Sequence, residues 1–358
     1  MLRDRRIRPG VGLVAALAAG GLLLALPPAA VGRPAGPAPA ALAWPAAQKA
    51  TLPADLPDGT AYEPGVFADA RTSAGTAPSR DGKSLRLVVR AGDGSVRQLR
   101  ALPSARNPSF QTLTVAGDQL FWFERSDTGL QLWAAGLAKG GPAHRVTADT
   151  GQARFYRSDH DLVVADGRLH WVASGPAGAT EVRSVALGGG PVDVRAVPGI
   201  WRLLSWPWMV DGVADTRGAR TLHNLATGRD VAIARPRKGD TDCSEAWCRI
   251  VSLDDDGYSR IELMRPDGGE RHEIAGGTAA TEIVDVVPLG RFEVFVRIGR
   301  NAELTGSAQL LVHETATRRT VEISPDAGNV TYRNGVLWWT TGNQESFVRH
   351  SLDLRTVP

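Results

Sequence analysis

The chain has 358 residues, enough for two average domains or one large repeat domain, and a formal net charge of +3 from 41 Lys and Arg against 38 Asp and Glu. With 43% hydrophobic and 22% charged residues, its composition excludes wholesale disorder. The 40 Gly and 23 Pro favour a protein with many turns over a helical one.

The N-terminal residues have the pattern of a secretory signal peptide. Four Arg within the first eight residues precede the apolar run Val11–Leu26, which ends at Pro27. A basic start, a short apolar run and small residues after it define such a signal. The run has 16 residues, fewer than the about 20 of a membrane-spanning helix. We therefore expect residues 1–40 to be a signal peptide and processing region. We expect the protein to be secreted or held in the cell envelope, without a stable membrane span once the signal is cleaved.

The sequence does not decide the cleavage site, the export route or whether the signal is cleaved. Cleavage motifs of the A-x-A type occur at Ala38–Ala40 and Ala41–Ala43, and a cut nearer Ala30 is also compatible with the small residues there. The pair Arg5-Arg6 leaves both the general and the twin-arginine export routes open. An uncleaved membrane anchor is the alternative to a cleaved signal.

The signal accounts for the positive net charge. Residues 1–40 hold five Arg and one Asp, so the remainder has 36 basic and 37 acidic residues. Nucleic-acid binding needs clustered excess positive charge, and the mature chain has none. We expect no nucleic acid among its partners.

After the signal come an Ala/Pro-rich segment and then a repeat. Residues 41–58 show little periodicity and predict a flexible or extended lead-in. Three later segments share a Gly turn followed by a strand with Leu two residues before a Trp, which places both side chains on one face of the strand. These segments are 117–122, 167–171 and 335–339.

Each unit of this repeat also contains a hairpin. Seven hairpins follow one another at intervals of roughly 40 to 50 residues, separated by Gly-rich turns. The predicted strand pairs are 84–90 with 96–102, 130–135 with 144–147, 180–186 with 192–197, 220–225 with 230–233, 260–264 with 271–274, 309–313 with 320–323, and 346–351 with 354–357. Further strands are predicted ahead of the Gly turns, at 111–115, 161–165, 201–205, 282–287 and 329–333.

Four short antiparallel strands per unit at this period predict an all-β fold, a β-propeller. We expect one propeller domain over residues 59–358 with seven four-stranded blades, six or eight being the alternatives. The chain should end in the outermost strand of the last unit. Whether residues 62–68 complete a blade across the closure is left open.

The ten Trp separate into two groups. Trp122, Trp171 and Trp339 occupy equivalent positions, which predicts packing between adjacent blades. Trp201, Trp206 and Trp208 cluster near Pro207 in one unit, and we keep them as candidates for stacking on a sugar or peptide ligand.

Cys243 and Cys248 are the only cysteines. In an exported protein an even cysteine count indicates a disulfide, here between the first two strands of a blade. A redox-active pair is the alternative, although such pairs have C-x-x-C spacing at a helix start. Two cysteines are too few for a structural zinc site.

Together these features resemble the secreted TolB-like β-propeller proteins of high-GC actinobacteria. The resemblance rests on the Arg-rich signal, the Gly-x-Leu-x-Trp strands, the segment 243–248 and the Ser79–Lys83 turn, and it covers about residues 60–358. It implies the fold and a TolB-like binding or scaffold role, with no tested activity to transfer.

A search for catalytic or metal-binding patterns gives no site. The seven His are dispersed, and neither H-E-x-x-H nor G-x-S-x-G occurs. His170 should face the side of its strand opposite to Trp171, towards solvent. The segments 126–133 and 252–257 only approach an Asp box, and Asp254–Asp256 is a weak candidate for Ca²⁺ beside its simpler interpretation as a solvated turn. We predict no catalytic residue, metal or cofactor.

The sequence therefore favours a non-enzymatic, monomeric binding or scaffold protein of the cell envelope or extracellular space, which holds an unidentified protein or glycan through loops on one face. A hydrolase or lyase acting on extracellular carbohydrate or peptide is the alternative, because propellers also host enzymes. Acidic residues, or a His with a carboxylate, clustered at one mouth of the channel would favour that alternative.

Overall fold

A computed structural model describes residues 36–358 apart from 139–140, 213–217, 300–301, 303–305 and 344–345. The chain divides into two units, Met1–Ala38 and Pro39–Pro358. Of the first unit only residues 36–38 are described, and the predicted signal peptide otherwise lies outside the described residues. The description below concerns the second unit.

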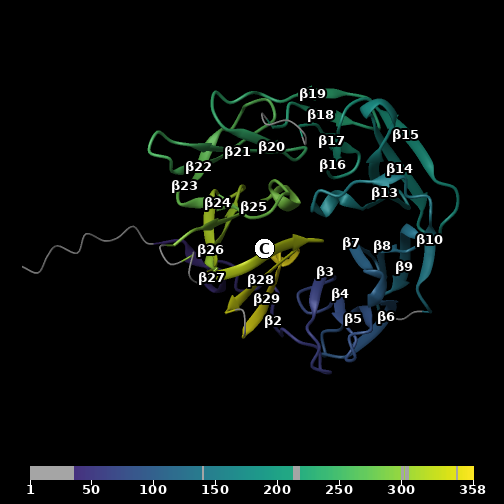
Figure 1. Ribbon diagram of the computed structural model, residues 1–358. Helices are drawn as coiled ribbons and strands as arrows, with labels where there is room; N and C mark the ends of the chain where they lie inside the picture. Colours follow the sequence, from purple (N-terminus) through teal and green to yellow (C-terminus); the bar gives the residue numbers. More distant parts are fainter. Residues whose placement is uncertain (1–35, 139–140, 213–217, 300–301, 303–305, 344–345) are drawn as a thin grey trace, which may run out of the picture. The chain divides into compact units, whose positions relative to one another are not determined.

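The second unit is built almost entirely from antiparallel strands in six sheets, which follow one another around a common centre (Figure 1). The first two sheets contain β3 (Glu63–Phe67), β4 (Ser73–Pro78), β5 (Ser84–Arg90) and β6 (Val96–Pro103), then β7 (Ser109–Ala116), β8 (Gln119–Ser126), β9 (Gly129–Gly136) and β10 (His144–Thr147). The third contains β11 (Gln152–Ala153), β12 (Val163–Ala165), β13 (Arg168–Ser174), β14 (Thr180–Ala186) and β15 (Asp193–Val197). The fourth and fifth contain β16 (Arg202–Leu203), β17 (Trp208–Val210), β18 (Thr221–Asn224) and β19 (Asp230–Ala232), then β20 (Asp240–Cys243), β21 (Cys248–Leu253), β22 (Ser259–Met264) and β23 (His272–Gly277).

The remaining sheet has eight strands and contains two groups that share one long strand. Its strands include β24 (Ala279–Thr281), β25 (Phe292–Arg297), β26 (Ala308–Glu314), β27 (Arg319–Arg333), β28 (Val336–Gly342), β29 (Phe347–Asp353), β2 (Lys49–Pro53) and β1 (Ala38–Pro39). The first part of β27 pairs with β26 and its last part with β28. An all-β structure of four-stranded antiparallel sheets set around a centre fits the predicted β-propeller.

Helical structure is brief in the described residues. It comprises α2 (Ala40–Ala43) and the 3-10 turns η1 (Ser104–Arg106), η2 (Asp159–Asp161), η3 (Pro176–Gly178), η4 (Pro288–Gly290) and η5 (Leu354–Thr356). No helix in this part of the chain has the length and apolar content needed to cross a bilayer.

The closure of the last sheet differs from the prediction. Residues 354–357 were expected to form its outermost strand, but Leu354–Thr356 is the turn η5. The outermost strand is β2, which pairs with β29 from Lys49 opposite Leu352 to Pro53 opposite Val348. It comes from the predicted lead-in, whose Ala/Pro-rich composition hides the strand. Residues 62–68, the other open question, contribute β3 to the first sheet instead.

Of two further predicted strands, one was only partly correct and the other was wrong. Residues 161–165 contain the end of η2 and only then β12, and residues 282–287 form no strand, because β24 ends at Thr281. Apart from 320–323, which is part of the much longer β27, and 354–357, the predicted hairpin strands agree with the structure to within a few residues at each end. Three of them match fully: Ser84–Arg90, His144–Thr147 and Thr180–Ala186.

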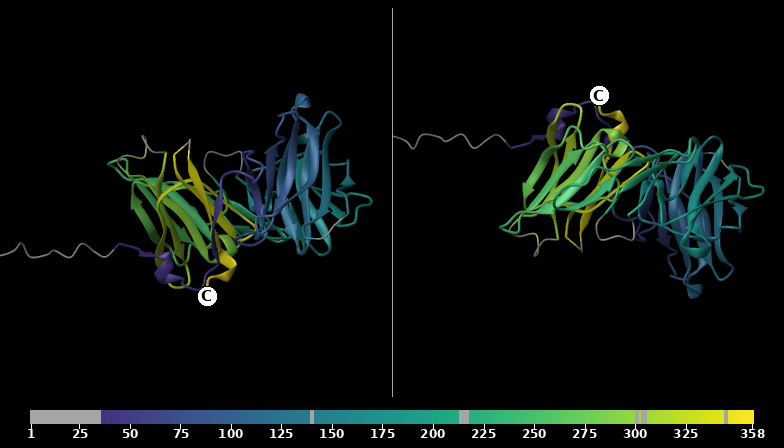
Figure 2. Two further views of the ribbon diagram at one scale, coloured as in Figure 1. Left: turned by 90° about the horizontal axis from the view of Figure 1, so that it is seen from below. Right: turned by 90° about the horizontal axis from the view of Figure 1, so that it is seen from above.

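The hydrophobic core lies between neighbouring sheets, as predicted from the repeated Trp. Trp122 packs with Leu87 of the first sheet, and Trp171 packs with Phe123 of the second. Both rings are fully buried. Trp339 belongs to a cluster that also contains Trp44, after α2, and Leu354 and Val357, near the chain end. The C-terminus accordingly lies beside α2 in both views of Figure 2.

Candidate functional site

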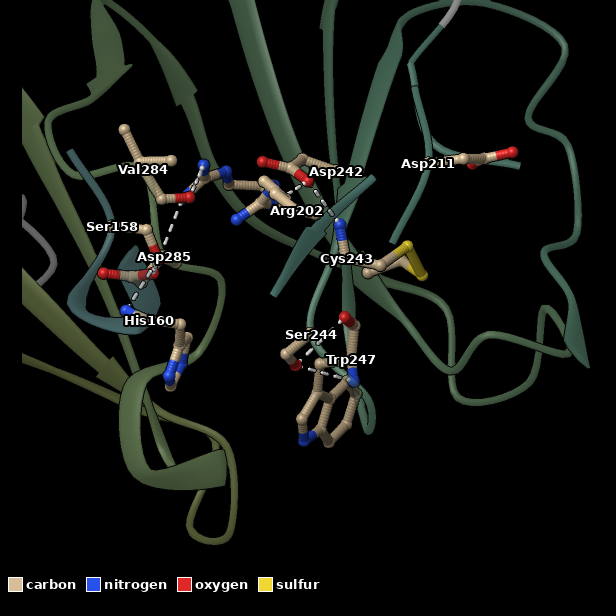
Figure 3. A network of polar contacts seen from close by, with 12 residues as sticks. Ser158, His160, Arg202, Asp211, Asp242, Cys243, Ser244, Trp247, Val284 and Asp285 are labelled. Carbon is tan, nitrogen blue, oxygen red and sulfur yellow. Dashed lines mark hydrogen bonds and ion pairs between the residues drawn. A yellow bond between two sulfur atoms is a disulfide. The ribbon is translucent and has the colours of Figure 1, made fainter. Parts of the chain in front are cut away.

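The innermost segments of four sheets meet in a cluster of polar side chains near the centre of the second unit (Figure 3). The turn η2, between β11 and β12 of the third sheet, contacts the segment 282–287 that leads into β25. Ser158 Oγ donates a hydrogen bond to Asp285 Oδ1 at 2.5 Å, and the backbone N–H of Asp159 donates to Asp285 Oδ2 at 2.9 Å. Asp285 thus uses both carboxylate oxygens to hold a turn that lies more than 120 residues earlier in the chain.

Glu293 likewise accepts hydrogen bonds with both of its carboxylate oxygens. Glu293 of β25 accepts from Arg249 Nη1 at 2.8 Å and from the backbone N–H of Val287 at 2.8 Å. Arg249 also donates to the carbonyl oxygens of Val284 and Asp285. Hence one ion pair fixes the path of the segment 282–287, which has no ladder hydrogen bonds of its own.

The turn between β27 and β28 completes the cluster. The backbone N–H of Asn334 donates to Asp159 Oδ1 at 2.8 Å, and Arg333 Nη2 donates to the carbonyl oxygen of Ser158 at 3.1 Å. The side chain of Asn334 donates to the carbonyl oxygen of Phe67 in β3. These bonds connect the last sheet to η2 and to the first sheet at the centre.

Burial changes the acid–base chemistry of this cluster. It raises the pKa of Asp159, a rise that His160 opposes and the charge of Asp285 reinforces. Burial likewise raises the pKa of Asp161 to about 6, although the backbone N–H of Tyr156 donates to its Oδ1 and lowers the pKa. The other oxygen of Asp161 is buried and has no hydrogen-bond partner among the described residues.

A pocket of about 230 Å³ opens beside this cluster. Polar groups from four separate segments line it, among them His160, Ser205, Glu245 and Asp285. Ser205 Oγ donates to Glu245 Oε1 at 2.7 Å, and Glu245 Oε2 has no partner among the described residues. In Figure 3 the His160 ring points away from Asp285.

The loop 287–290 forms one wall of this pocket and is strained. Val287 and Leu289 have φ angles of 46° and 58°, in the left-handed region that β-branched and bulky residues rarely adopt. Leu289 is nevertheless 51% exposed at the pocket. The fold therefore holds an apolar side chain in solvent at the mouth of a polar pocket.

The predicted disulfide is present. Cys243 and Cys248 are bonded and stand opposite each other on β20 and β21, the first two strands of the fifth sheet. Asp242, next to the disulfide, accepts from the backbone N–H of Cys243 at 2.8 Å and pairs with Arg202 of β16. The bridge thus stabilises the edge of the polar cluster.

The structure does not bring the three candidate stacking Trp together. Trp201 and Trp206 pack against one core cluster and Trp208 against another. All three are half-buried. Trp206 lines a pocket of about 240 Å³ at the outer strands of the third sheet.

His170 was expected to face solvent, and this was wrong. It is 4% exposed, because the ring of Trp206 stacks on it with centroids 3.7 Å apart. The covering residue lies 36 positions later in a loop of the next sheet, so the strand pattern alone could not reveal it. Burial lowers the pKa of His170.

The acidic run Asp254–Asp256 forms a hairpin turn. Asp254 Oδ1 accepts from the backbone N–H groups of Asp256 and Tyr258 at 3.0 and 2.8 Å. The described residues contain no group of three or more His, Cys, Asp or Glu placed to hold a metal ion.

Sequence reasoning missed the central cluster. Its members Asp285 and Glu293 lie in apolar surroundings, Ile283–Leu289 and Phe292–Val296, and a charged residue inside such a run is the only local signal of a buried partner. The identity of that partner requires the fold.

Comparisons with known proteins support the fold only. No protein-family model matches the chain, and no curated protein matches it either. Among solved structures, the uncharacterized protein lmo1340 from Listeria monocytogenes EGD-e is similar with a TM-score of 0.50 at 8% identity, over 78% of this chain and 88% of that one.

Two characterised proteins are similar at lower TM-scores. TolB from Acinetobacter baumannii has a TM-score of 0.40 at 10% identity, over 72% of this chain and 65% of that one. A puromycin-hydrolyzing peptidase of Mycobacterium tuberculosis has a TM-score of 0.41 at 13% identity, over 73% of this chain and 44% of that one. The chain thus spans less than two thirds of either protein, and at these scores neither supports a family or an activity. The sheets of the second unit show an all-β fold compatible with a propeller.

Proposed function

We propose that the chain is a secreted, non-enzymatic β-propeller of seven blades. It binds a partner of the cell envelope or extracellular space through the mouth of the pocket lined by His160, Glu245 and Leu289, here called the central pocket. The double pairing of β27 supports the blade count, because dividing the eight-stranded sheet there gives two further groups of four strands. The disulfide Cys243–Cys248 is compatible with an oxidising compartment. We propose a monomer that needs no cofactor.

The observation that carries this proposal is the exposed Leu289 beside the pocket. Backbone strain persists only where the surrounding structure or a function maintains it. Exposed apolar groups surrounded by polar ones are typical of the centres of protein interfaces. His160, Ser205 and Glu245 supply polar groups at the same pocket.

The state of the carboxylates also favours binding over catalysis. Both oxygens of Asp285 and both oxygens of Glu293 accept hydrogen bonds from groups that hold the inner segments together. A general base needs a lone pair that can reach the substrate proton. These two residues are therefore assigned to maintaining the pocket.

Site-specific photo-crosslinking in the producing cell tests the proposal. A benzophenone amino acid at position 289 should give one discrete adduct, and the same group at position 253 should not, since Leu253 is 64% exposed but lies on β21 away from this pocket. The adduct should disappear when His160 is also replaced by Ala. Equal labelling from both positions, or none from 289, would contradict the proposal.

A hydrolase or lyase remains the second candidate because of Glu245. Its free, buried Oε2 lines the same pocket as Asp159 and Asp285, which is the kind of acidic cluster that such a reaction uses. Turnover of any member of a panel of polysaccharides and peptides, abolished in Glu245→Gln and kept in Asp255→Asn, would establish this candidate and displace the first. Binding of a glycan by stacking on Trp206 is a further proposal, which Trp206→Ala tests in the same panel.

A further inference from the structure

A second, larger pocket of about 670 Å³ lies where the closing strand β2 joins the last sheet. The residues that matter here come from β2 (Lys49, Leu52), β5 (Arg90), β28 (Trp339) and β29 (His350, Leu352). None of its lining residues belongs to the central pocket described above. The function proposed for the central pocket therefore leaves it unexplained.

Arg90 brings an unsatisfied positive charge to this pocket. It is 8% exposed, and its Nε and Nη1 are buried without a hydrogen-bond partner among the described residues. Buried guanidinium donors are normally paired, because leaving them unpaired is unfavourable. An anion in the pocket that Arg90 lines would offset this charge.

Two further cationic side chains lie near Arg90, although their environment disfavours the charged form of each. Burial lowers the pKa of Arg349, Glu63 opposes that effect, and the charge of Arg90 adds to it. Lys49 also lines the pocket, and burial lowers its pKa. Glu322 provides a negative charge there, but its carboxylate already accepts from Gln309 Nε2.

The remaining wall is apolar and aromatic. Trp339 stacks on His350 with centroids 5.5 Å apart and an interplanar angle of 21°. The Nε1–H of Trp339 is a buried donor with no partner among the described residues. Leu52 and Leu352 complete this side. A pocket with apolar walls and a few polar or charged groups is the usual form of a small-molecule site.

We propose that this pocket binds a small amphipathic anion, whose carboxylate or phosphate contacts Arg90 and whose apolar body lies against Trp339 and Leu52. The charge of Arg90 selects anions over neutral or cationic molecules of the same shape. The size of the pocket accommodates a chain or ring system of drug-like dimensions.

Isothermal titration calorimetry with four ten-carbon probes tests this proposal: decanoate, monodecyl phosphate, decanol and decylamine, all below their micellar concentrations. We expect one site per chain for the anions and binding at least about tenfold weaker for decanol and decylamine. The tighter of the two anions identifies the preferred head group. Equal binding of decanoate and decanol, or no binding of either anion to the folded protein, would overturn the proposal.

Variants locate the site. Arg90→Gln should weaken anion binding about tenfold or more and leave decanol unchanged, whereas Arg90→Lys should keep part of the preference. Arg145→Gln is the matched control, because Arg145 is exposed on β10 and does not line the pocket. Ala50→Trp fills the pocket from β2 and should abolish binding even if Arg90→Gln fails to fold. Unchanged anion binding in Ala50→Trp would place the ligand elsewhere and refute the assignment.

Discussion

Arg249 of β21 and Glu293 of β25 form an ion pair that is removed from solvent, with side chains 7% and 0% exposed and Nη1 and Oε1 2.8 Å apart. The two residues lie in neighbouring sheets, so the pair connects the fifth sheet to the sixth at the centre of the molecule. Because a buried charge is stable only with its partner, this contact should be among the most sensitive in the protein.

Removing one member of this pair should be strongly destabilising. We expect Arg249→Met to lower the free energy of unfolding by about 3–5 kcal/mol, because Glu293 is left buried and unpaired, and the double variant with Glu293→Leu to recover most of the loss. Urea denaturation measures both. Lys238→Met, which breaks the exposed pair with Asp255, is the control and should change stability by less than about 0.5 kcal/mol. Similar effects of the two single variants would contradict the assignment.

Stability should depend on pH through Asp161. Its folded pKa of about 6 exceeds the unfolded value of about 3.9, so the native state binds more protons between these values. The contribution of Asp161 to stability is therefore complete below about pH 4 and is lost as the pH rises to about 6. Asp161→Asn should remove this loss. Its free energy of unfolding should therefore come to exceed that of the wild type by up to about 2–3 kcal/mol as the pH rises from 4 to 7.

Chemical denaturation at a series of pH values measures this difference. Asp255→Asn, at an exposed position, serves as the control and should follow the wild-type profile. Parallel profiles of Asp161→Asn and wild type would show that Asp161 is ionised in the folded protein at pH 5.

The closing strand should make a large contribution to stability. Leu52 on β2 is 7% exposed and packs with Phe67 and Trp338, so Leu52→Ala should cost about 2–5 kcal/mol. Leu42, only ten residues earlier, is 77% exposed, and Leu42→Ala should have no measurable effect. Thermal unfolding of both variants distinguishes a strand that is part of the core from a loosely attached lead-in. If β2 were a loosely attached lead-in, both substitutions would leave the unfolding temperature unchanged.

The predicted signal should be cleaved ahead of the core residues that follow it. Ala40 and Trp44 are 6% and 4% exposed, and the Trp44 ring packs edge-on against Phe292 with centroids 5.7 Å apart. A cut after Ala43 would remove the helix α2 from this cluster. We therefore expect cleavage nearer Ala30, which N-terminal sequencing of the exported protein determines. A mature protein starting at Trp44 would show that α2 is dispensable.

The sequence predicted those parts of the fold that depend on neighbouring residues. Trp122 and Trp171 were placed correctly between sheets, because a Gly turn and the alternation of a strand are enough to fix which face a side chain occupies. The disulfide was predictable for the same reason, since Cys243 and Cys248 flank one tight hairpin.

The central cluster depends on contacts that the sequence does not encode locally. Ser158 and Asp285 are 127 positions apart, and only the arrangement of the sheets brings them within hydrogen-bond distance. His170 was misplaced because its cover, Trp206, comes from another sheet. The strand β2 was missed because Lys49–Pro53 has weak strand character by itself and acquires its role from pairing with β29.

The pairing of Lys49–Pro53 with Val348–Leu352 has a consequence for how the protein is made. Synthesis proceeds from the N-terminus, so β2 emerges early and must wait for almost 300 further residues before its partner exists. During that interval both the waiting strand and the growing set of sheets expose unpaired edges, which promote aggregation. Folding can finish only after synthesis is nearly complete, and the cell has to keep the partial chain apart from its copies until then.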